Sequence, residues 1–155
     1  RVIEMSVERR QADGGALIEA EHDGYRARFG LVHHRRLYLS SSGDDLRGED
    51  KLVYTGDPGE IPLVATLRFH LHPRVRASVI QSGASALLRP PSGGGWRMRT
   101  DTGLSVNESV YFGTDTRQRC EQIVISTSLD GVRESGEITI RWALRREDVR
   151  AGGKD

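Results

Sequence analysis

The nine residues Val64-Ala65-Thr66-Leu67-Arg68-Phe69-His70-Leu71-His72 decide the fold class, because apolar and polar side chains alternate along them from Ala65 onward. Side chains of a β-strand point to opposite faces in turn. The pattern therefore predicts a strand with one buried and one exposed side. Segments of the same kind recur along most of the chain, and none sustains a helical period of 3.6 residues. The sequence therefore predicts an all-β protein.

Turn signals separate these segments at short intervals. Residues 12–15, Ala-Asp-Gly-Gly, end the first predicted strand. Asp23-Gly24 is predicted as a tight hairpin turn, because both central residues of a type I′ turn need positive φ and Asp-Gly supplies them. Residues 25–39 are then predicted as one strand with a bulge or bend at Gly30.

About eleven or twelve short strands with hairpin connections result from this division. They favour an antiparallel β-sandwich over a parallel α/β fold, and the irregular Gly-Pro break at 90–95 argues against one closed barrel. The predicted sandwich domain covers residues 1–146, followed by a flexible tail over 147–155. A strand pattern begins directly after Arg1, so we expect the chain to be a fragment of a longer protein and of a larger sandwich.

Composition and charge limit the classes of protein to which the chain can belong. A chain of 155 residues with 36% apolar and 29% charged side chains is typical of one globular domain. The formal charge of +1 gives no electrostatic argument for nucleic acid or an anionic membrane, although local basic patches stay open. No apolar run approaches the ~20 residues of a membrane span. Cys120 is the only cysteine, which excludes an internal disulfide.

The densest group of chemically active side chains lies in residues 22–39. On a regular strand His33 and Arg35 share one face, and His34 and Arg36 share the other. An arginine on the apolar side needs a carboxylate partner, which Glu49 or Asp50 on the following strand can supply.

A functional alternative for this group is an anion site. In it Arg35 or Arg36 holds a carboxylate, and the weak catalytic candidates are His22, Tyr25 and His34, with His33 also in contact with the substrate. β-Elimination on a uronic-acid polysaccharide needs such a combination, because a base must remove the proton next to a carboxylate whose charge is neutralised. A structural network of Arg, Glu and His side chains is the competing interpretation.

His70 and His72 form a second pair, on the same face of one predicted strand and about 7 Å apart. Two metal ligands can be presented in this way, but a third is needed and Arg68 in the same row would repel a cation. A substrate-facing polar row and plain solvent exposure are the alternatives.

Three further side chains need an assignment. Trp96, beside three glycines, is a candidate sugar-stacking platform or a packed rim residue, whereas Trp142 is expected in the core. Glu108 lies in register with apolar residues, so we expect it to point inward or to a bulge and to pair with Arg119.

A set of short motifs, taken in order, resembles the C-terminal part of heparinase II/III-like proteins of bacteria. The motifs are His22-Asp23-Gly24-Tyr25, residues 29–37, 46–50, 68–73, 95–96 and 108–111, and Gln122-Ile123-Val124 with Ile140-Arg141-Trp142. Each piece is weak, but together they cover nearly the whole chain.

The resemblance implies a polysaccharide lyase with an N-terminal α/α toroid and a C-terminal antiparallel β-sandwich, acting on uronic-acid glycans by β-elimination. In such lyases the catalytic tyrosine comes from the toroid, and the catalytic histidine and metal ligands come largely from earlier sandwich strands. It follows that this chain alone is expected to be inactive and to complete the cleft wall, with an acidic polysaccharide, the missing toroid and the upstream strands as partners.

Several expectations accompany this resemblance. We expect no cofactor in the fragment. Only the full-length parent could bind zinc. The family suggests a periplasmic or secreted location. An exposed docking face would produce a homodimer in isolation. The alternative function is a non-catalytic carbohydrate-binding or structural β-sandwich. The particular glycan does not follow from the sequence.

Overall fold

The computed structural model describes residues 2–113 and 116–147. Within them lie eleven strands, two one-turn helices and a short 3₁₀ turn. These are β1 (Met5–Ala12), β2 (Gly15–His22), α1 (Arg26–Phe29), β3 (Leu31–Leu39), β4 (Asp45–Tyr54), β5 (Val64–His70), β6 (Arg76–Ile80), η1 (Gln81–Gly83), β7 (Ser85–Arg89), β8 (Gly95–Thr100), β9 (Leu104–Tyr111), β10 (Gln118–Ser128), α2 (Val132–Ser135) and β11 (Glu137–Glu147). The predicted all-β antiparallel sandwich is confirmed.

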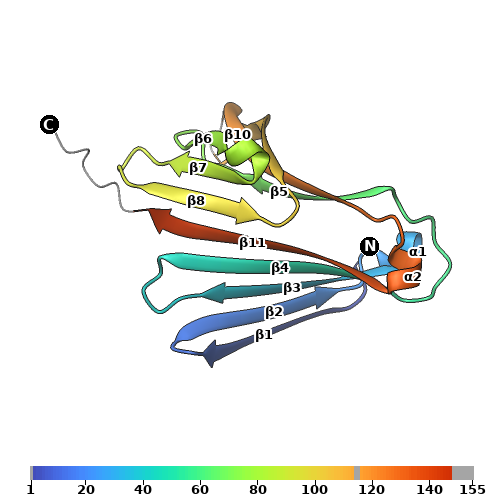
Figure 1. Cartoon of the computed structure of the whole chain (residues 1–155). Coiled ribbons are helices and arrows are strands. Elements are labelled where there is room, and N and C mark those ends of the chain that lie inside the picture. The colour runs from blue at the N-terminus through green and yellow to red at the C-terminus, as the bar shows by residue number, and fades with distance from the viewer. Residues whose placement is uncertain (1, 114–115, 148–155) are drawn as a thin grey trace, which may run out of the picture.

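The two sheets differ in width. The larger has eight strands in the order β1-β2-β3-β4-β11-β8-β7-β6, and the smaller has three in the order β5-β10-β9. All pairs are antiparallel, and β11 is inserted between β4 and β8, so the last strand joins the two halves of the wide sheet. Figure 1 shows the small sheet near β6, β7 and β8, while β1 to β4 fan out on the other side of β11.

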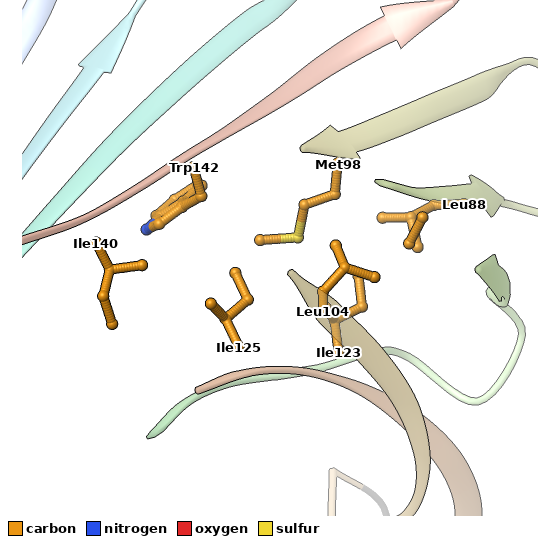
Figure 2. Packing of buried hydrophobic residues seen from close by; sticks show 8 residues of the cluster. Leu88, Met98, Leu104, Ile123, Ile125, Ile140 and Trp142 are labelled. Carbon is orange, nitrogen blue, oxygen red and sulfur yellow. The ribbon is translucent and has the colours of Figure 1, made fainter. Parts of the chain in front are cut away.

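The main core lies between the small sheet and one half of the wide sheet. Figure 2 shows Met98 and Trp142 of the wide sheet pointing toward Leu104, Ile123 and Ile125 of the small sheet. A second, smaller cluster at the other end is formed by Leu31, Leu129 and Val132, beside α1 and α2.

The far edge of the wide sheet is not covered in the same way. Met5 and Val7 of β1 are 73% and 62% exposed, on the face of the sheet that continues the core. This edge strand presents apolar side chains to its surroundings.

Two turn predictions had different outcomes. Asp13 and Gly14 join β1 to β2 with φ of 49° and 76°, as a tight Asp-Gly hairpin requires. The tight turn predicted at Asp23-Gly24 was wrong: β2 and β3 do pair as antiparallel neighbours, but their connection runs through α1, which ends at Gly30 with φ of 67°. The Asp23 carboxylate accepts hydrogen bonds from the backbone N–H groups of Ile3 and Glu4, while its carbonyl accepts from Arg26 N–H at the start of α1.

Three smaller expectations also need correction. The strand predicted for 25–39 covers only Leu31–Leu39, and β5 ends at His70 because Val75 N–H donates to the His72 carbonyl and turns the chain. Glu108 pairs with Arg119 as expected, but its side chain is 82% exposed and does not point inward. Of the tail predicted for 147–155, only Glu147 is described, as the last residue of β11; the rest lies outside the described residues.

No helix in the described ranges is long and apolar enough to cross a membrane.

Candidate functional site

A chain of hydrogen bonds links side chains of three neighbouring strands on the inner face of the wide sheet. His22 of β2 is paired in register with His33 of β3, and the Nε2 of His22 lies 3.0 Å from the Nδ1 of His33. The Nε2 of His33 lies 2.8 Å from an oxygen of Asp50 on β4. We refer to His22, His33 and Asp50 as the relay.

The partners at each nitrogen assign the tautomers of the relay. Gly24 N–H donates to Nδ1 of His22, so the proton of a neutral His22 lies on Nε2 and is donated to Nδ1 of His33. His33 then donates its Nε2–H to the Asp50 carboxylate. Each hydrogen bond of the relay has one donor and one acceptor when both imidazoles are neutral and Asp50 is ionised.

Asp50 is the buried anchor of this network, with 3% of its side chain exposed. Besides His33, it accepts hydrogen bonds from Arg35 Nε at 2.7 Å and from the indole N–H of Trp142 at 2.9 Å. Burial raises the pKa of Asp50, but the hydrogen bonds from these three donors outweigh it and hold the pKa below 3.8. The expected carboxylate partner of the inward arginine is therefore Asp50.

The surroundings of His22 favour its neutral form. Burial lowers the pKa of this imidazole below 6.5, and the nearby His33 and Arg35 lower it further, while Asp23 opposes them. The ring of Tyr25 lies 5.2 Å from that of His22, and the Tyr25 side chain is 43% exposed. Tyr25 is thus the accessible end of the cluster.

The relay borders a cavity of about 310 Å³ between the two sheets. Tyr25, His33 and Asp50 contribute most of its polar groups. The remainder is mostly apolar and comes from α1, the wide sheet, β5 and the segment before α2: Phe29, Leu31, Leu52, Pro62, Val64, Ala65, Thr66, Leu67, Leu129, Ile138 and Ile140. Such a lining suits the apolar face of a ring or an alkyl group, with hydrogen bonding at one end.

His34 and Arg36 lie on the opposite, outer face of β3. His34 Nδ1 is 3.1 Å from Glu21, and Arg36 makes two hydrogen bonds to one oxygen of Glu19. Glu49 also faces outward and accepts from Arg141. The structure therefore does not bring Tyr25 together with His34 and Arg36.

The remaining predicted site residues are dispersed. Trp96 is partly buried and packs against the main core cluster. His70 is exposed, with Nδ1 2.8 Å from Ser109 Oγ, and His72 makes an edge-to-face contact with Tyr111. Among residues 2–113 and 116–147, no group of three His, Cys, Asp or Glu side chains is arranged so that it could hold a metal ion. The described residues alone therefore do not fit a zinc site.

Trp142 was assigned to the core from the sequence, but its part in the site was missed. The available signal was chemical, since a buried tryptophan needs an acceptor for its N–H and a buried aspartate needs donors. Its partner Asp50 lies 92 residues earlier in the chain, so the strand register had to be known to join the two.

Comparison with known proteins places this arrangement in context. The family model described as "Heparinase II/III-like, C-terminal" matches residues 2–143. The chain is 39% identical over 142 residues to FtsZ-localized protein C of Caulobacter vibrioides, an alignment that covers 87% of this chain and 24% of that protein.

Two solved structures share the fold. The heparan sulfate lyase HepC of Pedobacter heparinus superposes with a TM-score of 0.73 at 10% identity, over 97% of this chain and 23% of that one. A heparinase III structure gives a TM-score of 0.62 at 14% identity, over 92% and 21%. The chain spans about a quarter of the length of these proteins, and at such identities the structures show the fold alone.

Proposed function

Because the chain belongs to the family of heparinase II/III-like C-terminal domains, we propose that it is the β-sandwich part of a polysaccharide-lyase-like protein. In this role it contributes one wall of a site for an acidic, uronic-acid-containing glycan. The group that carries the proposal is the relay with Tyr25, at the mouth of the cavity between the sheets.

The chemistry of this group suits binding better than catalysis. Elimination next to a carboxylate needs a base with a free lone pair, but Nδ1 of the neutral His22 already accepts from Gly24 and Nε2 donates to His33. Among the described residues, Arg35 donates a hydrogen bond only from its Nε–H, to Asp50. Its terminal N–H groups are therefore left to hold a carboxylate. We therefore assign Arg35 and Tyr25 to glycan contact, and the base to another part of the protein.

Titration calorimetry of the 155-residue chain with a glucuronate-containing oligosaccharide tests the binding role. Tyr25→Phe and Arg35→Gln should each weaken binding, because they remove a hydroxyl and a cationic fork from the proposed wall. Lys51→Gln removes one positive charge from the outer face of β4 and should leave the affinity unchanged. Urea unfolding of each variant separates lost contacts from lost folding.

Equal affinities for all three variants and the unchanged chain would contradict this binding wall. In a longer protein that contains this domain, ultraviolet absorbance of an unsaturated uronate product would report the elimination. The isolated chain should give no such product.

The identity to FtsZ-localized protein C favours a second candidate function, in which the sandwich is a non-catalytic module of a protein that localises with FtsZ. Co-sedimentation of the chain with FtsZ polymers tests it. Pelleting with polymer but not with unpolymerised FtsZ would support this function, and the absence of pelleting together with glycan binding would reject it in favour of the first.

A further inference from the structure

Charge is unevenly distributed along the chain. Residues 61–100 contain six arginines and two histidines but no aspartate or glutamate, although the whole chain has a net charge of only +1. This acid-free segment runs from the approach to β5 through the end of β8. Its positive charge must be balanced by other segments or by a partner.

Strand geometry brings much of this charge to the surface. Between residues 68 and 76 every second residue is exposed, and three of the four residues between them, Phe69, Leu71 and Val75, pack against the core. The turn between His72 and Val75 carries the chain from the small sheet to the edge of the wide one. The exposed residues, with Arg89 of the next strand, form what we call the basic belt: Arg68, His70, His72, Arg74, Arg76 and Arg89.

The belt contains an unfavourable pair. Arg76 of β6 and Arg89 of β7 are directly opposite each other in register, and neither has an ion-pair partner among the described residues. Like charges opposite each other on neighbouring strands are destabilising. Elsewhere in the wide sheet several exposed arginines do have partners, as in Arg36 of β3 with Glu19 and Arg141 of β11 with Glu49. The repulsion between Arg76 and Arg89 thus lowers the stability of the fold, and a bound anionic ligand would relieve it.

The surface beside Arg68 is suited to a carbohydrate. The residues of β5, β9 and β10 that alternate with the core side chains include no acid in the described ranges, and most carry hydroxyl or amide groups: Thr66, Ser105, Asn107, Ser109, Gln122 and Ser126. Arg68 itself has one long hydrogen bond, 3.4 Å to the amide oxygen of Gln122. Its other N–H groups have no described partner.

From these observations we propose that the basic belt is a second binding surface for an acidic polysaccharide, separate from the wall at Tyr25 and Arg35. Guanidinium groups bind carboxylates and sulfates through two parallel hydrogen bonds, and neighbouring hydroxyl and amide groups match sugar hydroxyls. A glycan strand would cross the corner between the two sheets. The choice of an acidic polysaccharide as the ligand rests on the proposed function. The location of the binding surface does not, because it follows from the exposed basic side chains.

Affinity electrophoresis and calorimetry of the 155-residue chain with heparan sulfate, alginate and neutral dextran test the belt. The double variant Arg76→Ala/Arg89→Ala should bind the acidic glycans roughly tenfold more weakly. The same variant should unfold at higher urea concentration, because it removes the repulsion. The control Arg10→Ala/Arg141→Ala also removes two exposed charges, both from existing ion pairs, and should keep its glycan affinity.

The outcomes separate the two surfaces. Weaker binding of both acidic glycans by the belt variant, with unchanged binding by the Arg10→Ala/Arg141→Ala control, supports the belt. Equal losses in belt and control variants, or tighter binding of duplex DNA or anionic vesicles than of either glycan, would overturn it. Loss of affinity in Arg35→Gln with full affinity in the belt variant would also overturn it, while leaving the proposed wall intact.

Discussion

At the scale of single residues, the site depends on how Asp50 is satisfied. Three donors from β3 and β11 converge on one carboxylate that is nearly inaccessible to solvent. Its neighbour Glu49 faces the other side of the sheet and makes an exposed ion pair with Arg141. Asp50 and Glu49 should therefore contribute very differently to the free energy of unfolding.

Asp50→Asn should lower the free energy of unfolding by about 2–4 kcal/mol, because an amide offers one acceptor and turns its NH₂ toward groups that are themselves donors. Glu49→Gln should change it by less than about 1 kcal/mol, as is usual for exposed pairs. Urea denaturation at neutral pH measures both. Similar losses in the two variants would contradict the buried role of Asp50.

Stability should fall on mild acidification because of His22. The folded-state pKa of His22 lies below 6.5, so the unfolded chain binds this proton more readily than the folded chain. The stabilisation is complete above about pH 6.5 and declines as the pH falls toward the lower, folded-state pKa. Asp50 acts with the same sign at lower pH, since its contribution is full above 3.8 and is lost as the pH falls through its folded pKa.

Urea unfolding between neutral and moderately acidic pH checks the histidine effect. His22→Gln should flatten the dependence, while His70→Gln, which replaces an exposed imidazole on β5, should retain it. An unchanged slope in His22→Gln would show that another group is responsible.

At the scale of elements, alternation was enough to predict the strands but not their ends. The pattern at 64–72 predicted β5 because its inward residues Leu67 and Phe69 do pack on the core. The helix α1 was missed because one turn is too short to show a helical period, and Asp23 binds the N-terminal segment through its side chain.

The close approach of β4 to Trp142 gives a test of strand packing. Gly48 is paired in register with Trp142, and a Cβ at Gly48 would overlap the indole ring. Gly48→Ala should therefore cost about 3 kcal/mol and shift the tryptophan fluorescence, because the ring must move away from Asp50.

Gly95 of β8 provides the matched control for this substitution. It is also buried in the wide sheet, but a Cβ there would lie 3.7 Å from Leu87, an ordinary contact. Gly95→Ala should be nearly neutral. A Gly48→Ala variant as stable as Gly95→Ala would show that the ring adapts without strain.

At the scale of the whole molecule, the unequal sheets explain what the sequence could and could not predict about the site. Arg35 and Asp50 lie on consecutive strands, so their pairing followed from a hairpin. The cavity, in contrast, depends on β5 and the segment before α2 lying across the wide sheet, and no local pattern encodes that placement.

The expected homodimer remains a prediction. β1 is an edge strand whose Met5 and Val7 are exposed on the inner face, and such edges associate. Val7→Lys should therefore shift the chain toward monomer in analytical ultracentrifugation, whereas Ser6→Lys, on the other face of the same strand, should leave association in place. A strictly monomeric unchanged chain would reject the prediction.

The late position of β11 also has a consequence for the order of events during synthesis. Strands β1 to β4 follow one another along the chain and can form hairpins as they emerge, but Trp142 leaves the ribosome 92 residues after Asp50. Until then β4 is an open edge, and its carboxylate lacks one of its donors. The edge of β4 therefore stays unpaired while the next 92 residues are made, and an unpaired edge is a site at which a nascent sheet associates with other chains.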